Sequence, residues 1–182
     1  RRSMPAEPAD TLPEQLALRA LPEDWTVAYS QGAGAQIAAT VTAAQHLLVR
    51  GPIENVEACR WTLRRWLNSK AHFHLTPWLR QVSQEIGLPF SKISVKGQKT
   101  IWASCSGKKN ISINYKLLFL PGRLVRYVFI HELCHTIHLN HSKAFWSLVA
   151  EKEPHYKRLD HEINKAWRYI PEWVERLSSS RS

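Results

Sequence analysis

The hydrophobic residues near the N-terminus follow the two-residue period of β-strands. Short alternating segments over residues 25–30, 35–41 and 45–50 are divided by glycine and other small residues, and this pattern predicts three strands. Because the connections are short, we expect an antiparallel meander. Residues 1–24, which precede it, are rich in Pro, Ala and Glu and are predicted to form a loose lead-in.

After Gly51-Pro52 the hydrophobic period changes to the three- and four-residue steps of a helix. Apolar residues recur at this spacing over residues 53–87, and Pro77 is expected to kink or divide the helix. Strand-like segments then return and are separated by turn residues. They lie at residues 93–95, 100–103 and 111–114.

Helical patterns dominate the C-terminal part of the chain. A helix is expected over residues 123–139, Ser142 is placed to cap a second one, and a third apolar pattern ends at Pro171. Strands, a helix, more strands and then helices together predict an α+β fold. We expect one domain over residues 25–177, followed by a disordered tail at 178–182.

The charge balance and the cysteines limit the classes of function. The formal charge of +10, from 25 Lys and Arg against 15 Asp and Glu, favours anionic partners such as nucleic acid or nucleotides. No run of five basic residues occurs, so this support is weak. Three cysteines without a CxxC pair argue against a disulfide framework or a cysteine zinc finger, and favour a reducing, cytoplasmic location.

The chain shows no signal for membrane insertion or secretion. No apolar run reaches the roughly 18 residues that a membrane-spanning helix needs. The N-terminal residues carry charge but no apolar segment of the kind found in signal peptides. We expect Met4 to be the native start, preceded by three residues that are foreign to the natural protein.

The segment His131-Glu132-Leu133-Cys134-His135 is an HExxH motif. Residues four apart lie on one face of a helix, so the imidazoles of His131 and His135 can converge on one divalent ion. Glu132 lies to the side of that pair, where a carboxylate contacts a water molecule bound to the metal. The chemistry is that of zinc hydrolases, in which three protein ligands leave one position open.

His141 is the best candidate for the third ligand. On a straight helix it would lie about 15 Å along the axis from His131, so the helix must break between them. Asn140 is the expected break because Asn tolerates the left-handed conformation. His138 shares the helical face of His131, but it is two turns from it and is expected to act only on substrate or on the order of the ligands.

Four segments together resemble the YgjP-like metallopeptidase-domain family, a group of minimal zincins related to the SprT and WLM proteases. They are Trp102-Ala-Ser-Cys-Ser106, Asn110-Ile-Ser-Ile-Asn114, the HExxH motif, and Asn140-His-Ser142 with Phe145-Trp146. The resemblance implies a zincin-like fold in which a small mixed sheet packs on a buried HExxH helix, with further C-terminal helices. It also implies metal binding by His131, His135 and His141, with Glu132 catalytic.

The chain departs from this family at two positions next to Trp102. Ile101 stands where the family usually has Arg, and Ala103 stands where it usually has Gly. If that Arg contacts substrate, substrate specificity differs in this chain. Function is decided by the residues of the site and not by the fold alone.

The sequence therefore predicts a zinc-dependent metallopeptidase that holds one zinc ion per chain. Glu132 would take a proton from the attacking water, and residues 111–115 would form an edge strand that receives a peptide substrate. Tyr127 and His138 are candidate donors to the oxyanion. Two alternatives stay open: a metal-dependent nucleotide phosphohydrolase, and a non-catalytic, zinc-stabilised module that binds DNA or protein.

Overall fold

The computed structural model describes residues 11–175, which cluster into two compact units. The described part of the first unit consists of residues 11–17, 24–66 and 172–175, and the second consists of residues 18–23 and 67–171. The single domain expected over residues 25–177 stays a prediction, because hydrophobic periodicity identifies elements but not how they cluster. The expected tail at 178–182 lies outside the described residues.

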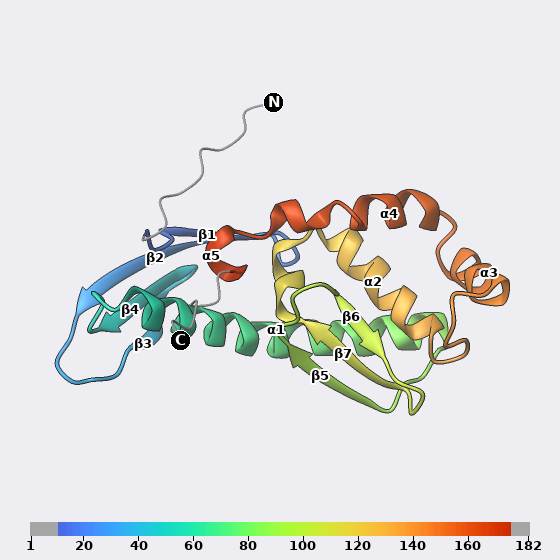
Figure 1. Ribbon diagram of the computed structural model, residues 1–182, viewed down its shortest axis with the longest axis horizontal. Helices are drawn as coiled ribbons and strands as arrows, with labels where there is room; N and C mark the ends of the chain where they lie inside the picture. The colour runs from blue at the N-terminus through green and yellow to red at the C-terminus, as the bar shows by residue number, and fades with distance from the viewer. Residues whose placement is uncertain (1–10, 176–182) are drawn as a thin grey trace, which may run out of the picture. The chain divides into compact units, whose positions relative to one another are not determined.

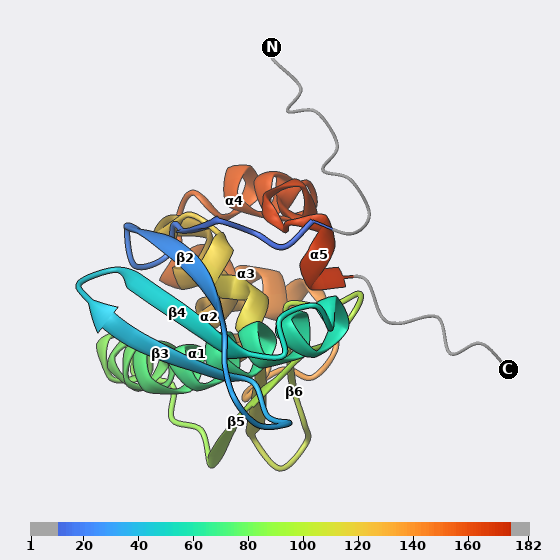
Figure 2. The same ribbon diagram turned by 90° about the vertical axis from the view of Figure 1, so that its left-hand side faces the viewer.

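A four-stranded sheet lies mainly in the first unit, with the strand order β1-β2-β4-β3. The strands are β1 (Gln15–Leu18), β2 (Glu23–Gln31), β3 (Ala38–Ala43) and β4 (His46–Gly51). Figure 2 shows β4 between β2 and β3, parallel to the former and antiparallel to the latter. The predicted meander is therefore wrong. Strand β4 is central because it buries Leu47 and Val49, whereas β3 is largely exposed and lies at the edge.

The predicted loose lead-in over residues 1–24 also needs correction. Residues 1–10 lie outside the described residues, but β1 and the start of β2 fall within the rest of this range. Leu16 and Leu18 of β1 are both buried, as the two-residue period of a strand requires. This alternation is only four residues long, too short to stand out among prolines and charges.

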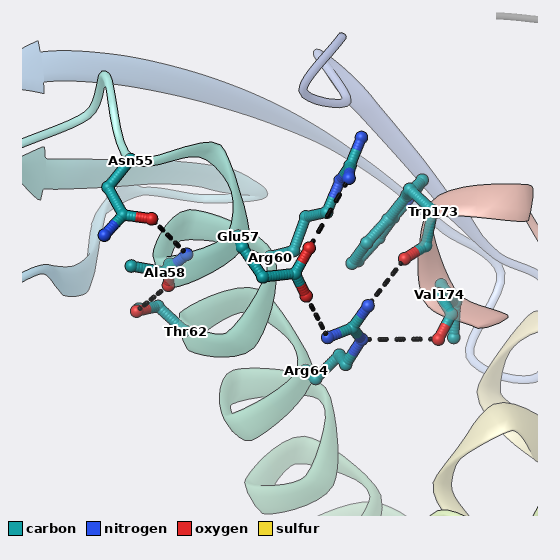
Figure 3. Close-up of polar contacts among 8 residues, drawn as sticks. All are labelled: Asn55, Glu57, Ala58, Arg60, Thr62, Arg64, Trp173 and Val174. Atoms are coloured by element: carbon teal, nitrogen blue, oxygen red, sulfur yellow. Dashed lines mark hydrogen bonds and ion pairs between the residues drawn. The ribbon is translucent and has the colours of Figure 1, made fainter. Parts of the chain in front are cut away.

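Helix α1 (Val56–Ile86) runs for 31 residues without a break at Pro77. Pro77 is exposed, so the carbonyl group that loses its hydrogen bond can be solvated by water. Asn55 caps the helix, because its side-chain oxygen accepts a hydrogen bond from the Ala58 backbone N–H at 3.1 Å (Figure 3).

Arg64 links the first half of α1 to the short helix α5 (Glu172–Glu175) within the first unit. Its guanidinium donates to the carbonyls of Trp173 at 3.0 Å and Val174 at 3.3 Å, and to Glu57 at 3.2 Å (Figure 3). A planar guanidinium can make several such bonds at once. The polar contacts of this region hold two helices together.

The second unit contains a small mixed sheet with the strand order β5-β7-β6. Its strands are β5 (Lys92–Lys96), β6 (Ala103–Cys105) and β7 (Asn110–Asn114), and β7 is parallel to β5 and antiparallel to β6. The prediction that residues 111–115 form an edge strand is wrong, because β7 is central. Strand β6 is an edge strand, and it begins at the last residue of the strand predicted for residues 100–103.

Helix α2 (Gly122–Cys134) is buried over most of its length and contacts β6, α3 and α4 (Figure 1). The other C-terminal elements are η1 (Tyr115–Phe119), α3 (Lys143–Lys152), α4 (Tyr156–Ile163) and η2 (Ala166–Tyr169). Trp78 of α1 packs edge-on against Phe129 of α2 with 5.4 Å between ring centroids. The predicted α+β fold, with a mixed sheet on a buried HExxH helix, is confirmed.

None of the helices within residues 11–175 combines the length and the apolar character that crossing a membrane requires.

Candidate metal centre

Three imidazoles meet at the C-terminal end of α2. His131 lies in the last turn, His135 is the C-cap residue, and His141 follows in the loop before α3. One ring nitrogen from each lies within 4.8 Å of the others, and the Nε2 atoms of His135 and His141 are 3.2 Å apart. Ligand nitrogens of a tetrahedral zinc ion at about 2.0–2.1 Å would be separated by roughly 3.3 Å. The donor set therefore fits a divalent metal.

The chain reverses through residues 135–141, earlier than the sequence predicted. Backbone bonds of the i to i+3 type close α2: His135 N–H donates to Glu132 at 3.1 Å, and Thr136 N–H donates to Leu133 at 3.0 Å. Such tightened turns end a helix without a left-handed residue. Among the described residues, the non-glycine positions with positive φ do not include Asn140. The proposed break at Asn140 is therefore wrong, although a break does bring His141 to the other two histidines.

A backbone carbonyl helps to orient His135. Its Nδ1 lies 2.9 Å from the carbonyl oxygen of His138, so Nδ1–H donates there and Nε2 carries the free lone pair. Burial lowers the pKa of the His135 imidazole, which favours the neutral form that binds metals. The part of His138 that orders the ligand is its carbonyl, which every amino acid supplies.

Two aromatic residues of α3 enclose the histidines. Phe145 stacks on His135 with 4.3 Å between ring centroids and an interplanar angle of 17°. Trp146 stacks on His141 at 5.8 Å and 23°. Ser142, the N-cap of α3, accepts a hydrogen bond from the Phe145 N–H at 3.2 Å, as the sequence predicted. This cap fixes where α3 begins and so which residues face the imidazoles.

Glu132 lies beside the three histidines without belonging to the cluster. Its side chain is 9% exposed, and its Oε1 is 3.3 Å from His131 Nδ1. The carboxylate also acts on Cys105 of strand β6: burial, followed by the negative charge of Glu132, raises the pKa of that thiol to about 11. Glu132 therefore lies close to both the histidine cluster and the edge strand.

A cavity of about 230 Å³ adjoins His131 and Glu132. One wall comes from residues 100–103, which include both departures from the family pattern, Ile101 and Ala103. Tyr127 and Val128 of α2 form the second wall. The third consists of Asp160 and Ile163 of α4 with the following Asn164.

Tyr127 is tied to the opposite wall of this cavity. Its hydroxyl donates to Asp160 Oδ1 at 2.7 Å, and burial, together with that carboxylate, raises the pKa of the phenol. The hydroxyl proton of Tyr127 is therefore already donated to Asp160. Asp160 was not found from the sequence, because no motif connects it with the HExxH segment.

The wall formed by residues 100–103 is held by buried polar groups that sequence reasoning did not identify. The Asn114 amide donates to the carbonyls of Gln98 at 2.8 Å and Ile101 at 3.1 Å, and Asn114 is fully buried. Trp102 stacks on Trp167 of η2 at 3.9 Å and 17°. Asn114 lies in one of the four segments that resemble the family, but the sequence did not indicate what its side chain does.

The remaining histidines lie outside this cluster. Within residues 11–175, the cluster at the end of α2 is the only group of three or more His, Cys, Asp or Glu residues arranged to hold a metal ion. The cluster does not include the others, which are His46, His72, His74, His138, His155 and His161.

Among the solved structures that are similar to part of this chain are two metallopeptidase zymogens. The crystal structure of the metallopeptidase zymogen of Pyrococcus abyssi abylysin is 24% identical, covers 50% of this chain and 91% of that chain, and gives a TM-score of 0.44. The corresponding zymogen, Methanocaldococcus jannaschii jannalysin, is 21% identical and covers 48% of this chain and 90% of that one, with a TM-score of 0.42. No curated protein is similar enough to count as a match.

The family comparison covers most of the chain. The YgjP-like, metallopeptidase domain family matches residues 3–166, a range that contains the three histidines, Glu132 and every wall of the cavity. This match supports a metal-dependent peptidase. The family indicated by the sequence motifs is thereby confirmed: the chain belongs to the YgjP-like metallopeptidase-domain family.

Proposed function

We propose that the chain is a zinc-dependent metallopeptidase in which His131, His135 and His141 hold one zinc ion and Glu132 is the general base. The observation that carries the proposal is the convergence of three imidazole nitrogens within 4.8 Å, with a buried carboxylate beside them and outside the set. Imidazole ligands suit zinc among the common divalent ions. When bound, zinc supplies a Lewis acid that polarises the peptide carbonyl and makes a water molecule more acidic.

Glu132 performs the proton transfers of this reaction. Its carboxylate accepts a proton from the attacking water and then delivers that proton to the leaving nitrogen as the peptide bond breaks. Because the side chain is 9% exposed, few water molecules compete for the carboxylate. A site with a purely structural zinc is closed by a fourth protein ligand, whereas here the cluster has three histidines and a carboxylate 3.3 Å from one of them that is suited to proton transfer.

Strand β6 is the element suited to receiving an extended peptide. The antiparallel register pairs Ser104 with Ser112, and Trp102 accepts a hydrogen bond from the Asn114 N–H at 2.9 Å. Since backbone groups alternate in direction along a strand, those of Ala103 and Cys105 point away from β7. A substrate strand pairing with this edge would run past Glu132 and the cavity, with its backbone held by main-chain hydrogen bonds.

The test is a comparison of wild type with Glu132→Gln, both reconstituted with zinc. The variant is expected to keep its zinc, because Glu132 is not a ligand, and to lose hydrolysis of a mixed peptide library by roughly 10²–10⁴-fold. Glu151→Gln, which removes an exposed carboxylate on α3, serves as the control and should match wild type.

Two results would contradict the proposal. Undiminished peptide hydrolysis by Glu132→Gln would show that the carboxylate is not the base. A wild-type protein that hydrolyses nucleoside phosphates and leaves the peptide library intact would show that the metal site serves a different reaction.

A further inference from the structure

The cavity beside Glu132 has the size of a single side chain. Its volume of about 230 Å³ lies below the roughly 300–1,000 Å³ of pockets that take drug-sized ligands. Ala103, whose backbone faces outward from the edge strand, lines the cavity. A peptide paired with β6 points alternate side chains to opposite faces, so a residue close to the scissile bond can extend into this space.

The walls of the cavity combine apolar and polar groups. Ile101, Val128 and Ile163 provide apolar surface, which suits the methylene stem of a long side chain. Asp160 provides a carboxylate, and Asn164 beside it provides an amide. The cavity therefore combines apolar surface with acceptor groups, which suits a cation on an aliphatic stem.

The charge of Asp160 is not neutralised by the protein. The Tyr127 hydroxyl donates to its side chain at 2.7 Å, which leaves acceptor capacity on a carboxylate that can take several hydrogen bonds. Among the described residues, no Lys or Arg lies within ion-pair distance of Asp160, and none lines the cavity. The other carboxylate there, Glu132, is committed to the reacting water.

The overall basic charge of the chain does not make the cavity favourable for an acidic side chain. The chain carries a formal charge of +10, but exposed charges more than about 8 Å away are largely screened at physiological ionic strength. The zinc ion held by His131 would lie at the Glu132 end of the cavity. An acidic side chain that reached Asp160 would meet that carboxylate, and no Lys or Arg lines the cavity to offset the repulsion. A neutral side chain of equal length would leave the acceptors of Asp160 without a donor from the substrate.

We propose that this cavity selects a substrate residue with a cationic side chain, lysine or arginine, next to the scissile bond, and that Asp160 is the specificity-determining residue. This inference rests on the proposed peptidase function. Tyr127 acts on specificity through Asp160, because its hydroxyl holds the carboxylate at the cavity wall.

The test uses end-blocked peptides that differ only at one position, which is lysine, arginine, norleucine or glutamate. Norleucine has the stem of lysine without the charge. Their binding is measured by titration calorimetry to zinc-loaded Glu132→Gln protein, which leaves peptides uncut, and their cleavage is measured with active protein. Lysine and arginine are expected to exceed norleucine by about tenfold or more, the order associated with a hydrogen bond to a charged group.

Asp160→Asn is the decisive variant. Cleavage is measured with the single variant, and binding is measured with Asp160→Asn combined with Glu132→Gln. The carboxamide oxygen of this variant can still accept from Tyr127, so the wall is preserved while the charge is removed. The lysine preference should fall to within a few-fold of norleucine, whereas Glu151→Gln, with the same change in net charge, should keep it. The proposal is overturned if protein with Asp160 intact shows no preference for lysine over norleucine, or if that preference persists after Asp160→Asn.

The two readouts separate this inference from the peptidase function. Preferential binding of lysine peptides that depends on Asp160, without cleavage by active protein, would uphold the cavity assignment and contradict the peptidase. Cleavage of all four peptides at equal rates would uphold the peptidase and overturn the cavity assignment.

Discussion

The candidate site has a metal side and a cavity side that are built in different ways. The metal side consists of His131, His135 and His141, which come from one continuous stretch of eleven residues. The cavity side joins residues 100–103, α2 and α4, which are far apart in the sequence. A local chain reversal suffices to assemble ligands, whereas a specificity pocket depends on how separate elements pack.

The two sides also differ in what holds them. Aromatic stacking supports the metal side, where Phe145 is fully buried against His135. Hydrogen bonds from buried polar groups support the cavity side, where Asn114 holds the carbonyls of residues 98 and 101. We therefore expect packing mutations to damage the metal side most and charge mutations to alter the cavity side most.

The largest effect on stability is expected for Phe145→Ala. Removing a buried phenylalanine costs roughly 3–5 kcal/mol, because transfer free energy is lost and a cavity remains. Phe73→Ala is the matched control, since Phe73 is 74% exposed, and it should change stability by only about 0.5 kcal/mol or less. Urea denaturation of both variants measures the difference. Equal midpoints would mean that the packing of Phe145 does not support the metal side.

A smaller loss is expected for Ser142→Ala. The Ser142 hydroxyl satisfies the Phe145 N–H at the start of α3, and loss of an N-cap costs about 0.5–2 kcal/mol. Ser147→Ala, an exposed position inside α3, provides the control. The same urea titrations apply, and a Ser142 variant as stable as the Ser147 variant would argue against the cap.

The sequence predicted the metal side more completely than the cavity side. The HExxH spacing and the return of His141 follow from helix geometry, and both needed only local reasoning. The position of the break was wrong, because i to i+3 bonds after Glu132 end α2 before Asn140 is reached. Such bonds depend on the balance of backbone hydrogen bonds in the last turn and leave no signature in residue type.

Long-range pairing accounts for the other differences. Residues 111–115 were expected at an edge, yet β7 is central because β5 pairs with it in parallel across a connection that includes β6. The N-terminal meander failed for the same reason, since β4 pairs with β2 in parallel. Alternation in a sequence identifies a strand but not its neighbours. The position of Asp160 in the cavity wall likewise depends on how α4 packs, which no local pattern predicts.

The smallest expected effect is electrostatic: a change in the pKa of the Cys105 thiol when the charge of Glu132 is removed. The negative charge of Glu132 contributes to the raised pKa of the Cys105 thiol, after burial. In metal-free protein, Glu132→Gln should lower this pKa and increase the thiolate fraction, so alkylation of Cys105 at pH 8.5 should become faster. Mass spectrometry of iodoacetamide-treated protein measures the rate at each cysteine.

Cys134 is the internal control for this measurement. Burial raises the pKa of its thiol to about 12, and Glu132 is not among the causes. Its alkylation rate should be the same in wild type and Glu132→Gln. An unchanged rate at Cys105, or equal changes at both cysteines, would show that the Glu132 carboxylate does not act on strand β6.

The most direct test of the account is a zinc competition titration of wild type, His141→Ala and His138→Ala against a chromophoric chelator. Wild type should bind one zinc ion per chain. Loss of a partner that only orients a ligand costs about 10–100-fold in metal affinity, so loss of His141 itself should cost at least that. His138→Ala should bind zinc like wild type, because the group that orients His135 is the backbone carbonyl of residue 138. Absence of zinc from reconstituted wild type, or a loss confined to His138→Ala, would contradict the account.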